Sequence, residues 1–352
     1  MPLEEESLRQ NAKKLLYDLV SIYTPSGEER RAEEFFERVA SNYGLKLEIT
    51  KSYSYLIGNG NILLASHIDT IPGFIEPRIE ENYIYGRGAV DAKGPLISML
   101  LATILLAQEG INVTFAALSG EESTSSGAME LLERGVKYDA IVIGEPTSTY
   151  NVAIEYRGSY KIKVKCSATA EHSSSSLNNL ILSTAERLLK ISSLPTDYDK
   201  PVIVPTMIKG GEVHNASPSS VEVLFDIRYS QNVNEDSILE KFKQTFSECE
   251  MEIVDHSKPI KVSPNTGVVR ALMRGLISQG IKAKLVRKNG TSDMNILQQI
   301  TKNIAAYGPG DSKLEHTPYE KISVDELMIG VKTYYFAVKE LLANNNLLLS
   351  RI

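Results

Sequence analysis

The sequence predicts a mixed α/β protein in which a mainly parallel sheet is covered by helices on both faces and carries a smaller inserted domain. Short β-rich runs alternate with helical patterns, which favours parallel strands joined by helices. Each of these runs is followed at once by Gly, Ser, His, Asp or Glu, as expected where a functional site forms at the carboxyl ends of strands. Between residues 157 and 263 the element order changes to βαββαβ, which is a self-contained unit.

The larger domain is expected to span residues 1–156 and 264–352. Its helices are predicted from apolar residues at helical spacing, and its buried strands from short apolar runs. The expected elements are helices at 5–18 and 28–42, a strand at 61–65, a core helix at 95–108, strands at 113–118, 140–143 and 304–307, and helices at 268–279 and 324–344.

The inserted domain is expected to span residues 157–263, with turns that contain proline on either side. Its strands alternate in hydrophobicity, and its helices carry apolar residues on one face. The expected elements are a strand at 160–167, a helix at 177–191, strands at 202–209 and 221–229, a helix at 236–247 and a strand at 251–254.

Composition and charge exclude several functional classes. A formal charge of -6 over 352 residues argues against a general nucleic-acid binder, which needs a basic surface. The longest apolar stretch, at 95–107, is interrupted by Ser98 and Thr103 and is shorter than the roughly 20 residues of a membrane helix. Residues 1–6 are acidic and do not have the pattern of a signal peptide. We therefore expect no membrane segment and no export.

The two cysteines, Cys166 and Cys249, stand 83 positions apart and have no cysteine neighbour. This spacing indicates neither a CxxC metal site nor a disulfide framework. The simplest interpretation is a protein of the reducing cytoplasm.

His67 and Asp69 follow the first predicted buried strand. Imidazole is a preferred zinc ligand, and Asp69 lies on the same side of an extended backbone, where it could accept a hydrogen bond from the other ring nitrogen of His67. A surface histidine beside a turn aspartate is the alternative for this short motif taken alone.

Glu121 and Glu122 follow the second predicted buried strand. Adjacent side chains point apart, so one carboxylate could bind a metal while its neighbour accepts a proton from the attacking water, as metal-assisted hydrolysis requires. Taken alone, the pair also fits a helix start, where carboxylates meet the positive end of the dipole.

Three other motif classes are missing or incomplete. The Gly86-Arg87-Gly88 run lacks the third glycine of a dinucleotide fingerprint, because position 91 is Asp. The sequence contains neither a GxSxG nucleophile elbow nor a GxxxxGK[ST] phosphate loop. Nucleotide binding, serine hydrolysis and nucleoside-triphosphate hydrolysis are therefore not predicted.

Five motifs occur in a distinctive order along the chain. They are HxD at 67–69, GRGxxDxKG at 86–94, SGEE at 119–122, GEPT at 144–147, and GPGD at 308–311 with His316 after it. This order resembles the zinc-dependent aminoacylase and carboxypeptidase family, which includes acetylornithine deacetylase, succinyl-diaminopimelate desuccinylase and carboxypeptidase G. Together the motifs are far more specific than any one of them.

The resemblance implies two divalent ions in each subunit, zinc or else cobalt. His67 and Glu145 would bind the first ion, His316 and Glu122 the second, and Asp91 would bridge both.

The resemblance also implies the catalytic roles. Glu121 would act first as general base and then as general acid, and Asp69 would orient His67. The peptide bond between Asp91 and Ala92 is expected to be cis, as is usual in the family.

In the resembled family the inserted domain is a lid through which two subunits dimerise. His172 would reach the neighbouring subunit's active site and stabilise the oxyanion, although the proline that usually follows this histidine is absent here, and a polar loop histidine is the alternative. Asn215 and Arg228 would bind a substrate carboxylate, and Thr291 lies in a loop that would line the substrate pocket. His214 and His256 are interpreted as structural or surface residues.

The length of the chain and the run at 308–320 are most similar to the branch of this family that releases lysine or ornithine from an acidic amino-group carrier protein, in lysine and arginine biosynthesis. The amide would join the γ-carboxyl of the carrier's C-terminal glutamate to the α-amino group. The alternatives are acetylornithine deacetylase, succinyl-diaminopimelate desuccinylase, and a broader dipeptidase or carboxypeptidase. A non-catalytic binding protein is disfavoured, because every implied ligand and Glu121 are present.

An acidic carrier predicts a basic patch beside the metal site. Lys209, Arg157 and Lys93 are the contributors that we consider.

Overall fold

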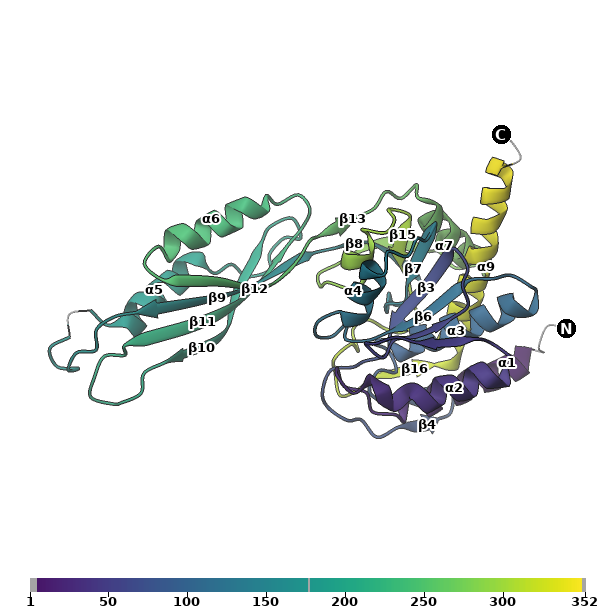
Figure 1. The fold of residues 1–352 in the computed structure, drawn as a ribbon, viewed down its shortest axis with the longest axis horizontal. Helices are drawn as coiled ribbons and strands as arrows, with labels where there is room; N and C mark the ends of the chain where they lie inside the picture. The colour runs from purple at the N-terminus through teal and green to yellow at the C-terminus, as the bar shows by residue number, and fades with distance from the viewer. Residues whose placement is uncertain (1–4, 177, 350–352) are drawn as a thin grey trace. The chain divides into compact units, whose positions relative to one another are not determined.

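The computed structural model describes residues 5–176 and 178–349, with side chains up to residue 343. The chain divides into two compact units (Figure 1). Unit 1 comprises Met1–Ile154, Val262–Arg287 and Ser292–Ile352, and unit 2 comprises Glu155–Lys261 with the short return Lys288–Thr291. The N-terminal expectation falls partly on residues 1–4, which lie outside the described residues.

The four predicted buried runs of unit 1 form the parallel centre of a nine-stranded sheet. These strands are β3 (Ile62–His67), β6 (Thr114–Leu118), β7 (Ala140–Ile143) and β15 (Ile304–Ala306). They pair in the order β6-β3-β7-β15, and every one of their residues is buried. Burial on both faces explains why these runs are continuously apolar rather than alternating. The predicted fold class is confirmed.

Antiparallel strands flank this parallel centre. On one side lie β2 (Tyr55–Ile57) and β1 (Leu47–Ile49), and on the other lie β8 (Asn151–Tyr156), β13 (Ile260–Lys261) and β14 (Lys284–Lys288). A separate three-stranded sheet has the order β16 (Lys321–Ser323), β5 (Tyr83–Tyr85) and β4 (Arg78–Glu80).

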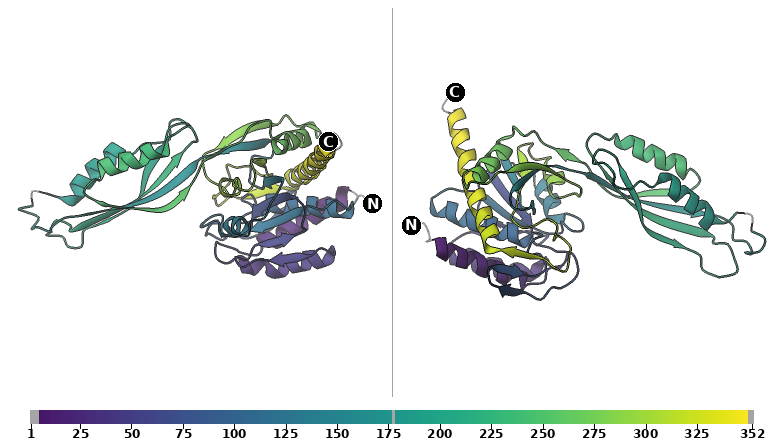
Figure 2. Two further views of the ribbon diagram at one scale, coloured as in Figure 1. Left: turned by 45° about the horizontal axis from the view of Figure 1, so that its top comes forward. Right: turned by 180° about the vertical axis from the view of Figure 1, so that it is seen from behind.

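The helices of unit 1 pack against its two sheets or against one another. They are α1 (Glu5–Val20), η1 (Glu29–Ala32), α2 (Glu33–Asn42), α3 (Lys93–Gln108), α4 (Ser126–Glu133), α7 (Gly267–Ile277), α8 (Met294–Leu297) and α9 (Val324–Leu349). Helix α3 is buried along almost its whole length, because it packs against β3 and β6 and is itself covered by α1 and α9. The right-hand view of Figure 2 shows α9 running across unit 1.

No helix in the described part of the chain combines the length and the apolar character needed to cross a membrane.

Unit 2 is an antiparallel sheet covered by two helices. Its elements are β9 (Gly158–Ser167), α5 (Leu180–Ile191), β10 (Val202–Gly210), β11 (Ser220–Tyr229), α6 (Glu235–Thr245) and β12 (Glu250–Ser257). The strand order is β10-β11-β9-β12, and Ile162, Phe225 and Phe242 belong to its core. The helix predicted to begin at residue 177 is described from Leu180, because residue 177 lies outside the described residues.

Cys166 and Cys249 form a disulfide, which corrects the interpretation that these cysteines are unpaired. The reason is the strand register. In the β9–β12 pairing Glu250 lies opposite Lys165, so Cys249, one residue before β12, comes opposite Cys166 near the end of β9. A sequence spacing of 83 hides this neighbourhood, and the bond removes our ground for expecting a reducing compartment.

Candidate metal centre

The carboxyl ends of three neighbouring parallel strands bring histidine and glutamate side chains to one edge of the sheet. Strand β3 ends at His67, which lies in register with the last residue of β6, Leu118. Two residues intervene between β6 and Glu121, and one between β7 and Glu145. In an α/β sheet this edge is where ligands bind.

Asp91 lies between two histidines of this edge. Its Oδ1 is 3.1 Å from Nε2 of His67, and its Oδ2 is 3.2 Å from Nε2 of His316. The Asp91–Ala92 peptide bond, just before α3, is cis, as the resemblance implied. One carboxylate with each oxygen facing a different imidazole is the arrangement expected of a bridging ligand between two ions.

Glu122 completes this cluster. Its Oε1 is 2.9 Å from Nε2 of His316, whose backbone adopts a left-handed φ of 62°. Ligand atoms of His67, Asp91 and Glu122 all lie within 4.8 Å of one another, whereas Glu145 is outside that group. We call His67, Asp91, Glu122 and His316 the candidate metal centre, because neutral imidazole and ionised carboxylate are the donors that zinc and cobalt prefer.

Hydrogen bonds within the candidate metal centre shift the pKa values of its own residues. Hydrogen bonds to Asp91 and then Glu122 raise the pKa of His316 to about 10. Burial alone would raise the pKa of Asp91, but hydrogen bonds from His316 and His67 outweigh it and lower that pKa. The site therefore holds ionised carboxylates against imidazoles, and divalent cations would compete with protons for the same lone pairs.

Glu121, next to the candidate metal centre, has the opposite electrostatic character. Burial, and then the negative charge of Glu145, raise its pKa well above the usual value of a carboxyl group. A carboxylate with raised proton affinity at a metal site is suited to accept a proton from water near neutral pH.

Asp69 contacts Nδ1 of His67, the ring nitrogen that it was predicted to face, through its backbone as well as its side chain. Its backbone carbonyl, 2.8 Å from Nδ1 of His67, is the closer partner, and its carboxylate Oδ1 is 3.5 Å from that nitrogen. A carbonyl only accepts, so a neutral His67 carries its proton on Nδ1 and keeps the Nε2 lone pair for a metal. The carboxylate also accepts hydrogen bonds from the backbone N–H groups of Glu121 and Glu122, at 3.0 and 3.1 Å.

Asp293 is a buried carboxyl of this region to which the sequence analysis gave no role. Burial raises its pKa to about 7, and the charge of His67 opposes that rise. Its Oδ1 has no hydrogen-bond partner among the described residues. The signal was present in the Gly290-Thr291-Ser292-Asp293 loop, where we had singled out only Thr291.

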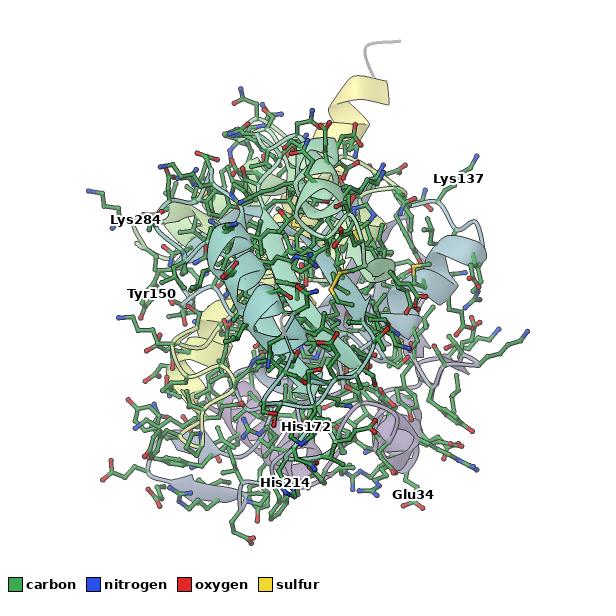
Figure 3. The ribbon with its side chains drawn as sticks, turned by 90° about the vertical axis from the view of Figure 1, so that its left-hand side faces the viewer. Glu34, Lys137, Tyr150, His172, His214 and Lys284 are labelled. Carbon is green, nitrogen blue, oxygen red and sulfur yellow. A yellow bond between two sulfur atoms is a disulfide. The ribbon has the colours of Figure 1, made fainter. Side chains whose placement is uncertain are left out.

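The other predicted substrate contacts belong to unit 2 and fall into two pairs at opposite ends of β11. Arg228 on β11 donates from Nη1 to Oγ1 of Thr291 at 3.2 Å and from Nε to the carboxylate of Asp226. His172 and Asn215 lie on two exposed loops that meet through the backbone hydrogen bond from Ser173 to Asn215. Figure 3 shows the loop that carries His172 beside the one that carries His214.

Two of the three residues considered for a basic patch are buried, so that assignment was wrong. Lys93 donates from Nζ to the backbone oxygens of Leu19 and Ile22, and Arg157 donates from Nη2 to two backbone oxygens of the 197–198 turn. Lys209 is exposed, but it lies directly opposite Glu222 in the β10–β11 ladder. Whether a lysine or arginine is buried among backbone carbonyls depends on the tertiary structure, and the residue type alone does not predict it.

Comparison with known proteins decides the family. The model of peptidase family M20/M25/M40 matches residues 63–340, which includes every residue of the candidate metal centre. The chain belongs to peptidase family M20/M25/M40. Membership in this peptidase family makes the chain a metal-dependent amide or peptide hydrolase.

Individual relatives match nearly the whole chain. A protein of Saccharolobus islandicus named "[LysW]-lysine/[LysW]-ornithine hydrolase" is 52% identical over 342 residues, which is 97% of this chain and 99% of the relative. A protein of the same name from Sulfurisphaera tokodaii is 52% identical over 341 residues, again 97% of this chain and 99% of the relative.

Solved structures of the family share the fold. A tripeptidase from Staphylococcus aureus has a TM-score of 0.84 at 18% identity, covering 95% of this chain and 98% of that chain. An M20 metallo-carboxypeptidase from Sulfolobus solfataricus has a TM-score of 0.79 at 18% identity, covering 96% and 99%. A dinuclear metal-binding M20 peptidase from Bacillus subtilis has a TM-score of 0.74 at 13% identity, covering 96% and 99%.

Proposed function

We propose that the protein hydrolyses the amide that links lysine or ornithine, through its α-amino group, to the γ-carboxyl of the C-terminal glutamate of an acidic amino-group carrier protein. The observation that carries the proposal is the 52% identity, over 97% of the chain, to relatives named for lysine and ornithine release from a LysW conjugate. Such a reaction would complete lysine or arginine biosynthesis in the cytoplasm.

We assign His67, Asp91, Glu122, Glu145 and His316 to the binding of two divalent ions, zinc or else cobalt. The geometry of four of them supports this assignment, because Asp91 faces His67 with one oxygen and His316 with the other, while Glu122 contacts His316. Glu145 is included because it is buried and because its charge acts on Glu121. When bound, the ions would supply Lewis-acid activation of the amide carbonyl and of the attacking water.

Glu121 is assigned the proton transfers of the reaction. Its carboxylate accepts a proton from water as the oxygen attacks the amide carbon, and the same proton passes to the α-nitrogen as the C–N bond breaks. The raised pKa of Glu121 fits both steps, since the group must hold the proton between them. Asp69 positions this group, because its carboxylate fixes the backbone N–H groups of Glu121 and Glu122.

We assign the binding of the amino-acid end of the substrate to unit 2, including its short segment Lys288–Thr291. Arg228 suits an α-carboxylate, because a guanidinium donates through a planar fork, and Thr291 already accepts one of its hydrogen bonds. Asn215 lies beyond the other end of β11, beside the loop of His172, so it would donate to the substrate carboxylate in the partner's site together with His172. We also assign to unit 2 the contact of a homodimer, in which His172 would stabilise the oxyanion in the partner's site.

A comparison of substrates tests the proposal. The metal-loaded protein is assayed against carrier-bound lysine, carrier-bound ornithine, N-acetylornithine and succinyl-diaminopimelate. We expect release of lysine or ornithine from the carrier conjugates to be at least tenfold faster, in kcat/KM, than cleavage of either acyl amide. Equal or faster turnover of N-acetylornithine would overturn the assignment of substrate.

A further inference from the structure

One segment of the chain, most of it in unit 1, has a charge opposite to that of the whole chain. Residues 276–292 contain four basic side chains, Lys282, Lys284, Arg287 and Lys288, and no Asp or Glu. The formal charge of these 17 residues is therefore +4, within a chain whose formal charge is -6. A local excess of positive charge can attract an acidic partner even when the net charge of the whole chain is negative.

The fold places this segment at the outside of the nine-stranded sheet. Its centre is strand β14 (Lys284–Lys288), which pairs with β8 and lies off the main path of the sheet. Lys282, Lys284 and Arg287 are exposed. The basic residues are thus presented to solvent along an extended strand.

The charge of two of these lysines is not neutralised. Among residues 5–176 and 178–343, no carboxylate forms an ion pair with Lys282 or Lys284. By contrast, many exposed cations elsewhere on the chain are paired, as in Arg38 with Asp18 or Lys163 with Glu252. Two exposed lysines without an ion-pair partner retain their field for a binding partner.

Apolar groups lie among these cations. The backbone N–H of Lys284 donates to the carbonyl of Tyr150 at 3.3 Å, and Tyr150 and Leu285 are 48% and 37% exposed. Figure 3 shows Lys284 and Tyr150 on the same margin of the molecule. Tyrosine and aliphatic side chains between charges are typical of protein-binding surfaces.

The basic strand also leads directly to the catalytic region. The chain runs from Arg287 through the 288–292 loop to Asp293, a buried carboxyl that interacts electrostatically with His67 and Asp69. Six residues span at most about 20 Å. A protein that contacts β14 would therefore be within reach of the site with its terminal residues.

We propose that the exposed surface at the start of β14, with Lys282, Lys284 and Tyr150, docks the acidic surface of the carrier protein that presents the scissile amide. The proposal rests on the proposed function. It adds the surface of this protein that the carrier would contact. Docking of an acidic protein by a basic strand mainly accelerates encounter, so it acts on KM and is weakened by salt.

Charge reversal tests this surface. The double variant Lys282→Glu with Lys284→Glu is compared with the wild type on carrier-bound lysine and on the dipeptide of γ-glutamate and lysine that contains the same amide. We expect kcat/KM for the conjugate to fall by ~10-fold or more at low ionic strength, through KM, and its salt dependence to flatten. Hydrolysis of the dipeptide should be unchanged. The neutral variant Lys282→Gln with Lys284→Gln should lose less.

Lys137→Glu is the matched control, because Lys137 is also exposed and lies on the opposite margin in Figure 3. It should keep kcat/KM for the conjugate within twofold of the wild type. Melting temperature and metal content, measured for each variant, establish that the fold and the site are intact.

Two results would overturn the proposal. One is a double variant, folded and metal-loaded, that matches Lys137→Glu on the conjugate. The other is a double variant that no longer binds an RNA oligonucleotide bound by the wild type but has unchanged kcat/KM for the conjugate. That result would make β14 a nucleic-acid-binding strand. A wild-type protein that does not cleave the conjugate at all contradicts the proposed function instead.

Discussion

Arg87 and Glu320 form a buried ion pair, with Nη1 and Oε1 2.7 Å apart, across 233 positions of sequence. Glu320 also accepts a hydrogen bond from the backbone N–H of Gly88, and Arg87 also donates to the backbone oxygen of Thr317. The pair therefore joins the loop before Asp91 to the loop after His316. The contact therefore links two chain segments, distant in sequence, that each carry a residue of the candidate metal centre.

Glu320→Gln removes the charge of this pair and leaves the guanidinium buried without an anion. We expect the free energy of unfolding to fall by about 3 kcal/mol and the affinity for metal to fall by roughly tenfold or more. Denaturant unfolding and metal titration measure these effects. Glu80→Gln is the control, because Glu80 pairs with Arg78 in solvent, where water screens the interaction and its loss should hardly change stability. Equal losses in the two variants would refute the role of the buried pair.

Glu121→Gln separates proton transfer from metal binding. We expect bound metal to be retained and kcat to fall by ~1,000-fold or more, since the amide side chain cannot accept the proton of the attacking water. Elemental analysis and amino-acid release measure the two quantities. Glu122→Gln is the comparison, and it should lose metal because its carboxylate faces His316. A Glu121→Gln protein with near wild-type turnover would remove this residue from the mechanism.

The metal-free protein should become less stable as pH rises. Its partners Asp91 and Glu122 raise the pKa of His316 to about 10, so the stabilisation is complete below about pH 6.5, the usual pKa of histidine, and is lost as pH rises through about 10. Half of the His316 side chain is exposed, so the decrease should be modest. Thermal melting in a chelator, from pH 6 to 10, measures it.

His316→Gln is the control for this pH dependence. Its melting temperature in the chelator should decline less over the same range, because the titrating imidazole is gone. A decline as steep as that of the wild type would assign the effect to other groups.

The disulfide of unit 2 closes a large loop. For a separation of 83 residues, loop-closure entropy gives a stabilisation of about 4 to 5 kcal/mol. We expect Cys166→Ser with Cys249→Ser to lower the denaturant midpoint of unit 2 while metal binding by unit 1 is retained. Thiol alkylation of the unreduced, unfolded wild type should find no free thiol, and two free thiols would contradict the pairing.

The parallel centre of the sheet was predictable because its strands are buried on both faces. Runs such as Ala140–Ile143 are therefore apolar throughout, and each is followed directly by a turn or ligand residue. The flanking strand β14 was not predicted, because an outer strand with Lys284, Arg287 and Lys288 exposed or half-exposed has no apolar period. Edge strands carry charge for this reason.

The ligand types of the site were predictable from motif order, but their supports were not. The carboxylate of Asp69 holds two backbone N–H groups of the next loop, and this contact depends on how β3 and β6 align. Lys93 stands in the same motif as Asp91, yet its ammonium donates to two carbonyls, one in the last turn of α1 and one just after it. Such partners are distant in sequence and become visible only in the fold.

Restoration of metal to the chelated protein tests the central claim most directly. Lysine release from the carrier conjugate is measured as zinc is added in steps to a known concentration of metal-free chain. The arrangement of Asp91 between His67 and His316 predicts that activity rises until two ions are bound per chain. Full activity without metal, or saturation at one ion, would contradict a two-metal hydrolase.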